Sequence, residues 1–288
     1  STTSWLFGMN LWACYFLSST LLARCWSLES AHFDFNKLAT ETEGDGPETL
    51  ALYHTYDGQR ISTWHDIPFK TIDEDTGEAF LSFVCEIPKG TRAKFEIHKS
   101  VSHNAIIQDR KKGKLRFYQY GDSVVNYGAI AQTWEDPMLV HPDTGYGGDN
   151  DPVDVLQINA RPCVSGEVMP VRVLGCLALV DDDETDWKLI VVDANDPATF
   201  GLRDASQVPV VKIDEMREWF RRYKTAEGKG LNKFGLDEKV MGPEYATQVA
   251  EETHQAWIRL TTNQVKCVFD NEECWLPEWA QGGASSEL

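Results

Sequence analysis

The stretch TRAKFEIHK, residues 91–99, alternates small or apolar side chains with charged or polar ones. Ala93, Phe95 and Ile97 lie on one face of an extended chain, because successive side chains of a β-strand point to opposite sides. That face is expected to meet the core, and the face with Lys94 and Glu96 to carry charge. The stretch therefore predicts a β-strand.

Further short runs have the composition of β-strands, and clusters of Gly, Pro or Asp separate them. They cover residues 81–87, 114–120, 152–158, 168–180 and 187–193. Many short strands at this spacing are typical of a small barrel. Later in the chain, apolar side chains recur every three or four residues in 211–224 and again in 243–262. We expect a barrel with two main helices packed against it.

The chain of 288 residues is acidic, with 27 Lys and Arg against 45 Asp and Glu and a net charge of −18. Such a charge repels a phosphate backbone, so no nucleic-acid partner is expected. An acidic protein can still act on small anions if divalent cations bind to it, because the cation then determines the local electrostatic field.

The segment WLFGMNLWACYFLSSTLLA, residues 5–23, has no charged side chain and about the length of a membrane-spanning helix. We expect it to form a single transmembrane helix in an organelle membrane, with the mitochondrial inner membrane favoured over a plastid membrane. The chain starts at Ser1 without Met, which suggests that import has removed a presequence. The alternative is an apolar arm that packs on a partner subunit or on the body of the protein.

The distribution of charged residues suggests how the chain is divided into parts. Residues 29–48 hold six acidic side chains and one basic one, which predicts a solvated linker. Residues at the C-terminus are expected to wrap over the surface or fray, with Trp275, Leu276 and Trp279 docking part of them. The parts are a hydrophobic segment (1–28), an acidic linker and extension (29–60), a globular domain (61–265) and an acidic tail (266–288).

Seven cysteines are scattered along the chain, with no CxxC pair and no histidine at the spacing of a zinc site. Small buried cysteines in a reducing compartment have this distribution. We therefore expect reduced thiols at positions 14, 25, 85, 163, 176, 267 and 274.

The densest chemical signal is GGDNDPVDVLQI, residues 147–158. Asp149, Asp151 and Asp154 fall within six residues, and each carboxylate raises the pKa of its neighbours unless cations neutralise them. Because Asp154 enters a strand while the other two lie on the preceding loop, the three side chains can converge. Oxygen-only ligands favour Mg²⁺ or Mn²⁺ over zinc.

A second acidic group, DDDETDWK at 181–188, closes one predicted strand and opens the next. Alone it is better interpreted as a polar hairpin. Together with Asp149, Asp151, Asp154 and Glu96 it could complete a site for several metals. Clustered carboxylates with separate cations and hydroxyls are what phosphoryl transfer to water requires. The candidate cations and hydroxyls are Lys94, Arg116, Lys188, Lys224, Tyr127 and Tyr223.

At these residues the chain resembles the family I soluble inorganic pyrophosphatases, especially the longer eukaryotic type. The resemblance runs from about residue 64 to residue 257, roughly two thirds of the chain. DNDPVD is specific, and it stands in the same order with ETDWK and the Lys/Glu strand. The matching stretches are 65–69, 86–97, 106–117, 126–137, 148–158, 184–188, 195–197, 218–224 and 252–260.

The resemblance implies a mainly β (α+β) fold: an OB-type closed barrel of five strands with added hairpins and two main helices. It implies that Asp151 is the base for the attacking water, and that Lys94, Arg116 and Tyr127 also take part in catalysis. The implied metal ligands are Asp149, Asp154 and Asp186 for the tighter ions, Asp181 and Glu96 for ions that arrive with substrate, and Glu86 in the outer shell. The residues implied to grip the two phosphates are Lys94, Arg116, Tyr127, Lys188, Tyr223 and Lys224.

The expected function is Mg²⁺-dependent hydrolysis of inorganic pyrophosphate by an enzyme anchored to an organelle membrane, with several ions in the site. The alternative is a pyrophosphatase-like structural or accessory subunit of a membrane complex with weak or no activity. A sugar-transferase DxD motif at 149–151 is disfavoured, because no nucleotide-binding βαβ pattern accompanies it. The resemblance also suggests a homodimer. Residues 117–128 form a shorter loop than the family usually has, which bears on rate and metal preference.

Overall fold

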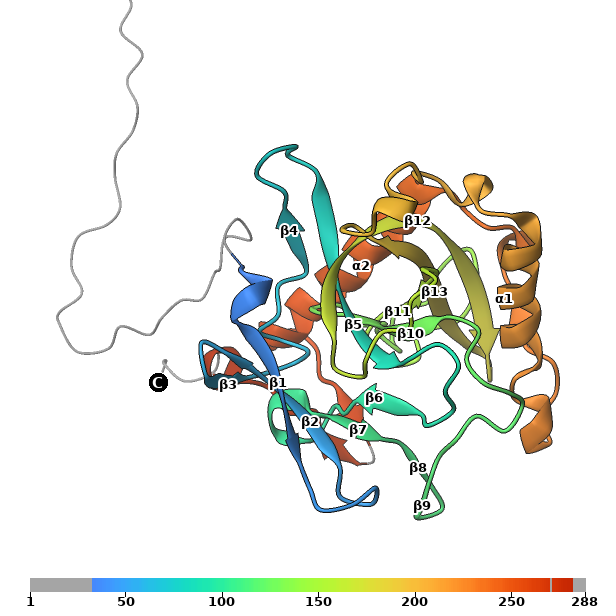
Figure 1. Cartoon of the computed structure of the whole chain (residues 1–288). Coiled ribbons are helices and arrows are strands. Elements are labelled where there is room, and N and C mark those ends of the chain that lie inside the picture. Colours follow the sequence, from blue (N-terminus) through green and yellow to red (C-terminus); the bar gives the residue numbers. More distant parts are fainter. Residues whose placement is uncertain (1–32, 270, 282–288) are drawn as a thin grey trace, which may run out of the picture.

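The computed structural model describes residues 33–269 and 271–281. Five strands hydrogen-bond in a closed cycle: β5 pairs with β10, β10 with β11, β11 with β13, β13 with β12, and β12 again with β5 (Figure 1). The expected mainly β class is confirmed, and this strand order fits the OB-like fold. The five strands are β5 (Ala79–Ile87), β10 (Asn126–Ile130), β11 (Asp154–Gln157), β12 (Val168–Asp181) and β13 (Glu184–Asp193).

A second sheet lies beside the cycle and carries TRAKFEIHK. Its strands are β1 (Leu38–Glu43), β2 (Ala51–Tyr56), β3 (Gln59–Ile61), β6 (Phe95–Ile97) and β7 (Ile106–Gln108). Short strands add to the edges: β4 (Lys70–Ile72) on β5, β14 (Lys233–Phe234) on β12, and the hairpins β8–β9 (Arg110–Lys111, Lys114–Leu115) and β15–β16 (Val268–Phe269, Glu272–Glu273).

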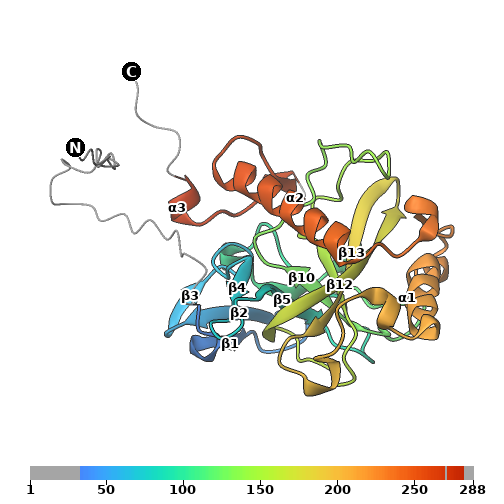
Figure 2. The same cartoon turned by 90° about the horizontal axis from the view of Figure 1, so that it is seen from above.

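The two main helices are confirmed as α1 (Val210–Arg222) and α2 (Pro243–Thr261), and a short α3 (Glu278–Gln281) follows. In Figure 2, α2 crosses above β12 and β13 while α1 flanks them. Residues from all five strands of the cycle form one apolar cluster with α2. Side chains on the other face of β12 and β13 form a second cluster with α1. Its members from α1 include Ile213, Met216 and Phe220. Within the described residues, six 3₁₀ turns complete the elements: 35–37, 102–104, 197–199, 205–207, 225–227 and 236–238.

Several predicted boundaries were wrong. Within 91–99 only residues 95–97 form a strand, and within 114–120 only 114–115 do so. Part of the expected linker is ordered: β1 pairs along its whole length with β2, although five of its six side chains stay exposed. An exposed edge strand has few apolar side chains, so charge alone could not distinguish it from a linker.

Two disulfides, Cys85–Cys163 and Cys267–Cys274, overturn the expectation of reduced thiols for those four residues. Tertiary folding brings Cys85 of β5 against the loop after β11, a contact between residues 78 apart that spacing cannot reveal. Cys267 and Cys274 face each other because β15 and β16 form a hairpin. Cys176 is buried with a free thiol.

The predicted membrane helix at 5–23, together with Cys14 and Cys25, lies outside the described residues. Among the residues that are described, no helix combines the length and the apolar character needed to cross a bilayer.

Candidate active site

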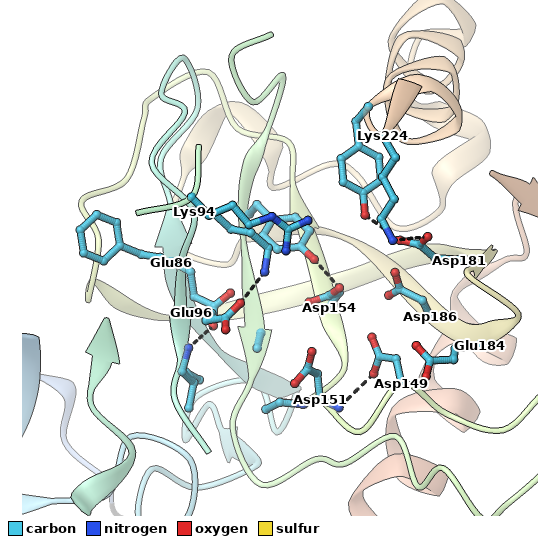
Figure 3. A pocket seen from close by; sticks show the side chains of 17 residues that line it. Glu86, Lys94, Glu96, Asp149, Asp151, Asp154, Asp181, Glu184, Asp186 and Lys224 are labelled. Carbon is cyan, nitrogen blue, oxygen red and sulfur yellow. Dashed lines mark hydrogen bonds and ion pairs between the residues drawn. The ribbon is translucent and has the colours of Figure 1, made fainter. Parts of the chain in front are cut away.

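One polar cavity of about 180 Å³ gathers the predicted residues (Figure 3). Lys94, Glu96 and Glu86 lie on one side of it, Asp181 and Lys224 on the other, with the aspartates between them. Every predicted site residue except Lys188 lines this cavity. Its wall holds Glu86, Lys94, Glu96, Arg116, Tyr127, Asp149, Asp151, Asp154, Asp181, Asp186, Tyr223 and Lys224, and also Glu184.

Strand register explains why Asp154, Asp186 and Lys188 converge. β11 runs parallel to β13 with Asp154 beside Lys188. Asp186 stands two residues before Lys188 on β13, so its side chain shares the same face. The Lys188 ammonium pairs with both carboxylates and is only 2% exposed. Tyr127 of β10 donates its hydroxyl hydrogen to Asp154. Lys188 therefore lies beneath the cavity, as an internal counter-ion of two aspartates.

The end of the β12–β13 hairpin supplies a second part of the site. Asp181 pairs across the turn with Glu184, and the turn residues Asp182 and Asp183 have φ of 52° and 66°. Such left-handed conformations suit a tight two-residue hairpin, for which Asp is a tolerant residue. Just after α1, Tyr223 donates to Asp181 at 2.7 Å, and the Lys224 ammonium pairs with the same carboxylate.

Opposite these residues, the polar face of β6 forms the other wall. Lys94 pairs with Glu96, and Asp109 accepts from Arg116 Nη1 at 2.8 Å while lying 3.4 Å from Lys94 Nζ. Glu86 of β5 is buried and accepts from the backbone N–H of Ile97 at 2.7 Å. The charged face predicted for residues 91–99 is thus half-buried, because it looks into the cavity instead of into bulk solvent.

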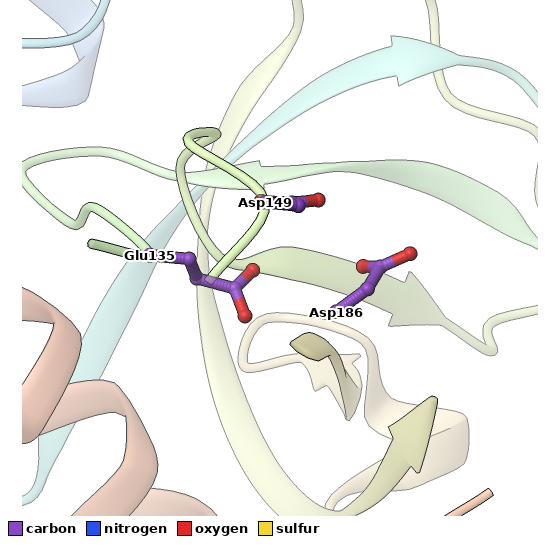
Figure 4. A group of neighbouring side chains, drawn as sticks. All are labelled: Glu135, Asp149 and Asp186. Carbon is purple, nitrogen blue, oxygen red and sulfur yellow. The ribbon is translucent and has the colours of Figure 1, made fainter. Parts of the chain in front are cut away.

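Glu135, Asp149 and Asp186 form a group whose ligand oxygens all lie within 4.8 Å of one another (Figure 4). The resemblance implied Asp149 and Asp186 as metal ligands together with Asp154, and it gave no role to Glu135. Gly148 permits the close approach, because a Cβ at this position would lie 2.3 Å from the carbonyl carbon of Glu135. The glycines of GGDND therefore bring the Asp149 loop against the backbone of Glu135.

These carboxylates are costly to ionise without a cation. Burial, followed by the charges of neighbouring aspartates, raises the pKa of Asp149 and of Glu135 well above the usual range. Burial also raises the pKa of Asp186, with Lys188 opposing it. Glu135 Oε2 is buried and has no hydrogen-bond partner among the described residues, while its Oε1 accepts from Trp187 N at 3.0 Å. An oxygen-rich group with an orphaned carboxylate oxygen fits a hard divalent cation.

Asp151 differs from the other aspartates in its surroundings. Its side chain is 44% exposed, and it pairs with the ammonium of Lys99, which is 6% exposed. Its backbone N–H donates to Asp149 Oδ1 at 2.9 Å. The carboxylate therefore lies at the surface of the cavity, held from behind by a buried cation.

Lys99, Asp109 and Glu135 received no role from the sequence, and Glu184 was named only as part of the acidic group at 181–188. Lys99 had a signal, because it occupies the next core-facing position after residues 93, 95 and 97 of the alternation. A lysine whose position in the alternation points it into the core needs a buried acidic partner. Asp109 and Glu135 lie on loops, and only the tertiary fold brings them to the site.

The sequence model of one family, described as inorganic pyrophosphatase, matches residues 83–258. The chain belongs to the inorganic pyrophosphatase family. Its members hydrolyse pyrophosphate, and this chain is an inorganic diphosphatase. It is 44% identical to an inorganic pyrophosphatase of Zygosaccharomyces bailii over 221 residues, covering 74% of this chain and 76% of that one. Over 228 residues it is 42% identical to a soluble chloroplastic pyrophosphatase of Chlamydomonas reinhardtii, covering 77% and 79% of the two chains.

Solved structures of family members agree with the fold. The inorganic pyrophosphatase of Trypanosoma brucei brucei superposes with a TM-score of 0.75 at 37% identity, covering 79% of this chain and 71% of that one. A truncated vacuolar soluble pyrophosphatase of Trypanosoma cruzi, solved in complex with PPi, gives a TM-score of 0.74 at 34% identity and covers 88% of this chain and 99% of that one.

Proposed function

We propose that the cavity hydrolyses inorganic pyrophosphate to two phosphates with bound Mg²⁺, for which Mn²⁺ can substitute. When bound, such ions neutralise phosphate oxygens and lower the pKa of water. Asp149, Asp154 and Asp186 would hold the tighter ions, and Glu135 adds a fourth buried carboxylate beside two of them. The carboxylates proposed for ions that enter with substrate are Asp181 and Glu96, with Glu86 in the outer shell.

The proton of the attacking water goes to Asp151 in this proposal. Its side chain is 44% exposed, against 12% for Asp154, and it lines the cavity directly. The Lys99 ammonium holds one oxygen and leaves the other side of the carboxylate for water. A positioned general base of this kind contributes about 10²–10⁴-fold to rate.

The two phosphates would lie between the cationic walls. Lys94 and Arg116 line one side of the cavity and Lys224 the other, and each of these cations pairs with a carboxylate here. Arrival of an anionic substrate with its cations exchanges these ion pairs for phosphate contacts. The hydroxyls of Tyr127 and Tyr223 can donate hydrogen bonds to phosphate oxygens from the same wall.

The observation that carries the proposal is that carboxylates and cations from separate parts of the chain face one cavity. Phosphate release from pyrophosphate by the purified chain tests it. Release should require Mg²⁺, stop with a chelator and resume when Mg²⁺ is added back. Release that a chelator leaves unchanged would exclude this mechanism. Absence of release at any Mg²⁺ concentration would favour the accessory-subunit alternative.

We also propose that residues 5–23 attach the enzyme to an organelle membrane, an inference supported by the sequence alone. The mitochondrial inner membrane is the membrane we favour. The experiment is carbonate extraction of membranes from cells that express the full chain or a chain without residues 1–28. The full chain should stay in the pellet and the shortened one in the supernatant; the reverse, or the same behaviour of both, would refute the anchor.

A further inference from the structure

The C-terminal hairpin, described at residues 267–269 and 271–274, lies beyond the part of the chain that matches the family, residues 83–258. It contains β15 and β16, and the Cys267–Cys274 disulfide closes its base. Neither the substrate cavity nor the metal group includes any of its residues. It nevertheless contacts the loop that carries Asp149 and Asp151, and those contacts give it a role.

The first contact runs through Asn150, which stands between the two aspartates. Asn150 Nδ2 donates to the carbonyl of Val268 at 3.0 Å, and its Oδ1 lies 3.4 Å from Cys267 Sγ. On the other side, Trp134 Nε1 donates to the same Oδ1 at 3.0 Å. Asn150 has φ of 72°, a left-handed conformation that needs support from its surroundings. The hairpin thus holds Asn150, whose left-handed backbone sets the direction of the loop between Asp149 and Asp151.

The second contact runs through Lys99, the partner of Asp151. Lys99 Nζ lies 4.3 Å from the centre of the Phe269 ring, and the Trp275 N–H donates to the Lys99 carbonyl at 2.8 Å. The ring lies against the ammonium and keeps water from it, which strengthens its ion pair with Asp151. Side chain and backbone of Lys99 are therefore both held by the C-terminal segment.

We propose that the hairpin is a positioning element for the catalytic carboxylate. Through Asn150 and Lys99 it holds Asp151 where an attacking water can be deprotonated, and the disulfide keeps the hairpin in the shape that makes these contacts. The proposal rests on the role proposed above for Asp151. Phe269 is a positioning residue, since it acts on Asp151 only through Lys99.

Three variants of the full chain test this. Phe269→Ala removes the ring, Phe269→Tyr retains it, and the double variant Cys267→Ser with Cys274→Ser opens the base of the hairpin. Misplacing a catalytic group by about 1 Å can cost up to about 10²-fold in rate. Phe269→Ala and the double serine variant should therefore lose about 10-fold in kcat, with KM for pyrophosphate within about 2-fold. Phe269→Tyr should keep kcat close to that of the wild type, because the ring is retained. Glu273→Gln, which breaks the exposed pair with Lys266 on the same hairpin, is the matched control.

A dithiol reductant provides the same test without mutation. It breaks the S–S bond by supplying two electrons, so that two cysteine thiols form and the reductant becomes its own disulfide. Dithiothreitol should lower kcat of the wild type toward that of the double serine variant. In the double serine variant any loss caused by dithiothreitol reports Cys85–Cys163 instead, which separates the two disulfides.

Amide hydrogen exchange of residues 148–153 gives a readout independent of activity. Exchange should be faster in Phe269→Ala and in the double serine variant than in Glu273→Gln, because the loop has lost its outer support. Unchanged exchange and unchanged kcat in Phe269→Ala and in the double serine variant would overturn the positioning role of the hairpin. The role of Asp151 as the base would not be affected.

The opposite result is full activity of Asp151→Asn together with faster exchange in the two hairpin variants. It would refute Asp151 as the base, while the contact between hairpin and loop would remain. If Phe269→Ala does not fold, the serine variant decides.

Discussion

Lys188 and Asp154 stand side by side in the parallel pair β11–β13, and the buried ammonium of Lys188 also pairs with Asp186. The resemblance implied that Lys188 grips phosphate. That role stays a prediction; in the structure Lys188 is 2% exposed, does not line the cavity, and neutralises two carboxylates that would otherwise repel each other. In the mechanism proposed above, Lys188 and a bound cation would both stabilise this pair of aspartates.

The first prediction concerns Lys188→Met. Without divalent ions, this variant should lose about 3–5 kcal/mol of unfolding free energy, because it leaves buried charges unpaired. Saturating Mg²⁺ should recover more stability in the variant than in the wild type. Urea unfolding with chelator and with Mg²⁺ measures both effects. Lys239→Met, which breaks an exposed pair with Asp237, is the control and should change little. Equal losses with and without Mg²⁺ would contradict a shared role.

The second prediction separates the base from a ligand. Asp151→Asn should cut turnover by about 10²–10⁴-fold while Mg²⁺ binding is largely kept, since an amide cannot take a proton from water. Asp154→Asn should weaken Mg²⁺ binding as well. Phosphate release and calorimetric Mg²⁺ titration compare the two, with Asp183→Asn on the exposed hairpin turn as control. Indistinguishable titrations for the two site variants would show that this division of roles is incorrect.

The third prediction concerns Gly148→Ala. A Cβ here would lie 2.3 Å from the carbonyl carbon of Glu135 and 2.4 Å from its oxygen, so the loop must move away. We expect Mg²⁺ affinity to fall and stability to drop by about 1–3 kcal/mol, the usual range for overpacking. Gly201→Ala is the matched control, because a Cβ there meets no atom within 4 Å. Wild-type affinity in Gly148→Ala would mean that the approach of Asp149 to Glu135 does not matter for the metal.

The fourth prediction concerns pH. His65 Nδ1 accepts from Trp257 Nε1 at 2.8 Å, and its Nε2 lies 3.2 Å from the Trp275 carbonyl, so only the neutral ring satisfies both. Burial lowers the pKa of His65 to about 3. A depressed pKa gives stability that is complete above the unfolded value of about 6.5 and is lost as pH falls toward 3, by about 1.4 kcal/mol per unit.

Urea unfolding between pH 7 and pH 4 measures this loss. His65→Gln should be less stable than wild type at pH 7 and should show a flatter decline below pH 6.5. Comparison of the two proteins at each pH cancels the carboxylates of the active site, which contribute equally to both. Parallel declines in the two proteins would rule out His65 as a source of acid sensitivity.

Much of the fold could be predicted because its longest strands and both main helices carry strong periodicity. β12 and β13 match runs of apolar residues, and α1 and α2 match apolar stripes. β1 could not be predicted, because its exposed, acidic side chains resemble those of a linker. The boundaries of β6 failed for another reason: Lys94 and Glu96 line a cavity, so the alternation of side chains continues beyond the paired residues.

The candidate site could be predicted where motifs place several carboxylates close together in sequence. Asp149, Asp151 and Asp154 lie within six residues of one another in the sequence. Lys99 and Glu135 become site residues only through contacts made across the fold, with Asp151 in one case and with Asp149 and Asp186 in the other. Residue type and motif identified the candidate site residues. They could not tell which of these side chains the fold buries, and Lys188 is an example.

The closed cycle of strands also constrains the order in which the protein can be made. β5 lacks its partner β12 until about residue 181 has been synthesised, and β11 lacks its partner β13 until about residue 193. α2, which packs on the cluster shared by all five strands, comes later still. A chain still growing on the ribosome therefore presents unpaired strand edges, the feature that promotes association between chains. Translation pauses before residue 193 should raise the demand for chaperones, whereas pauses after α2 should not.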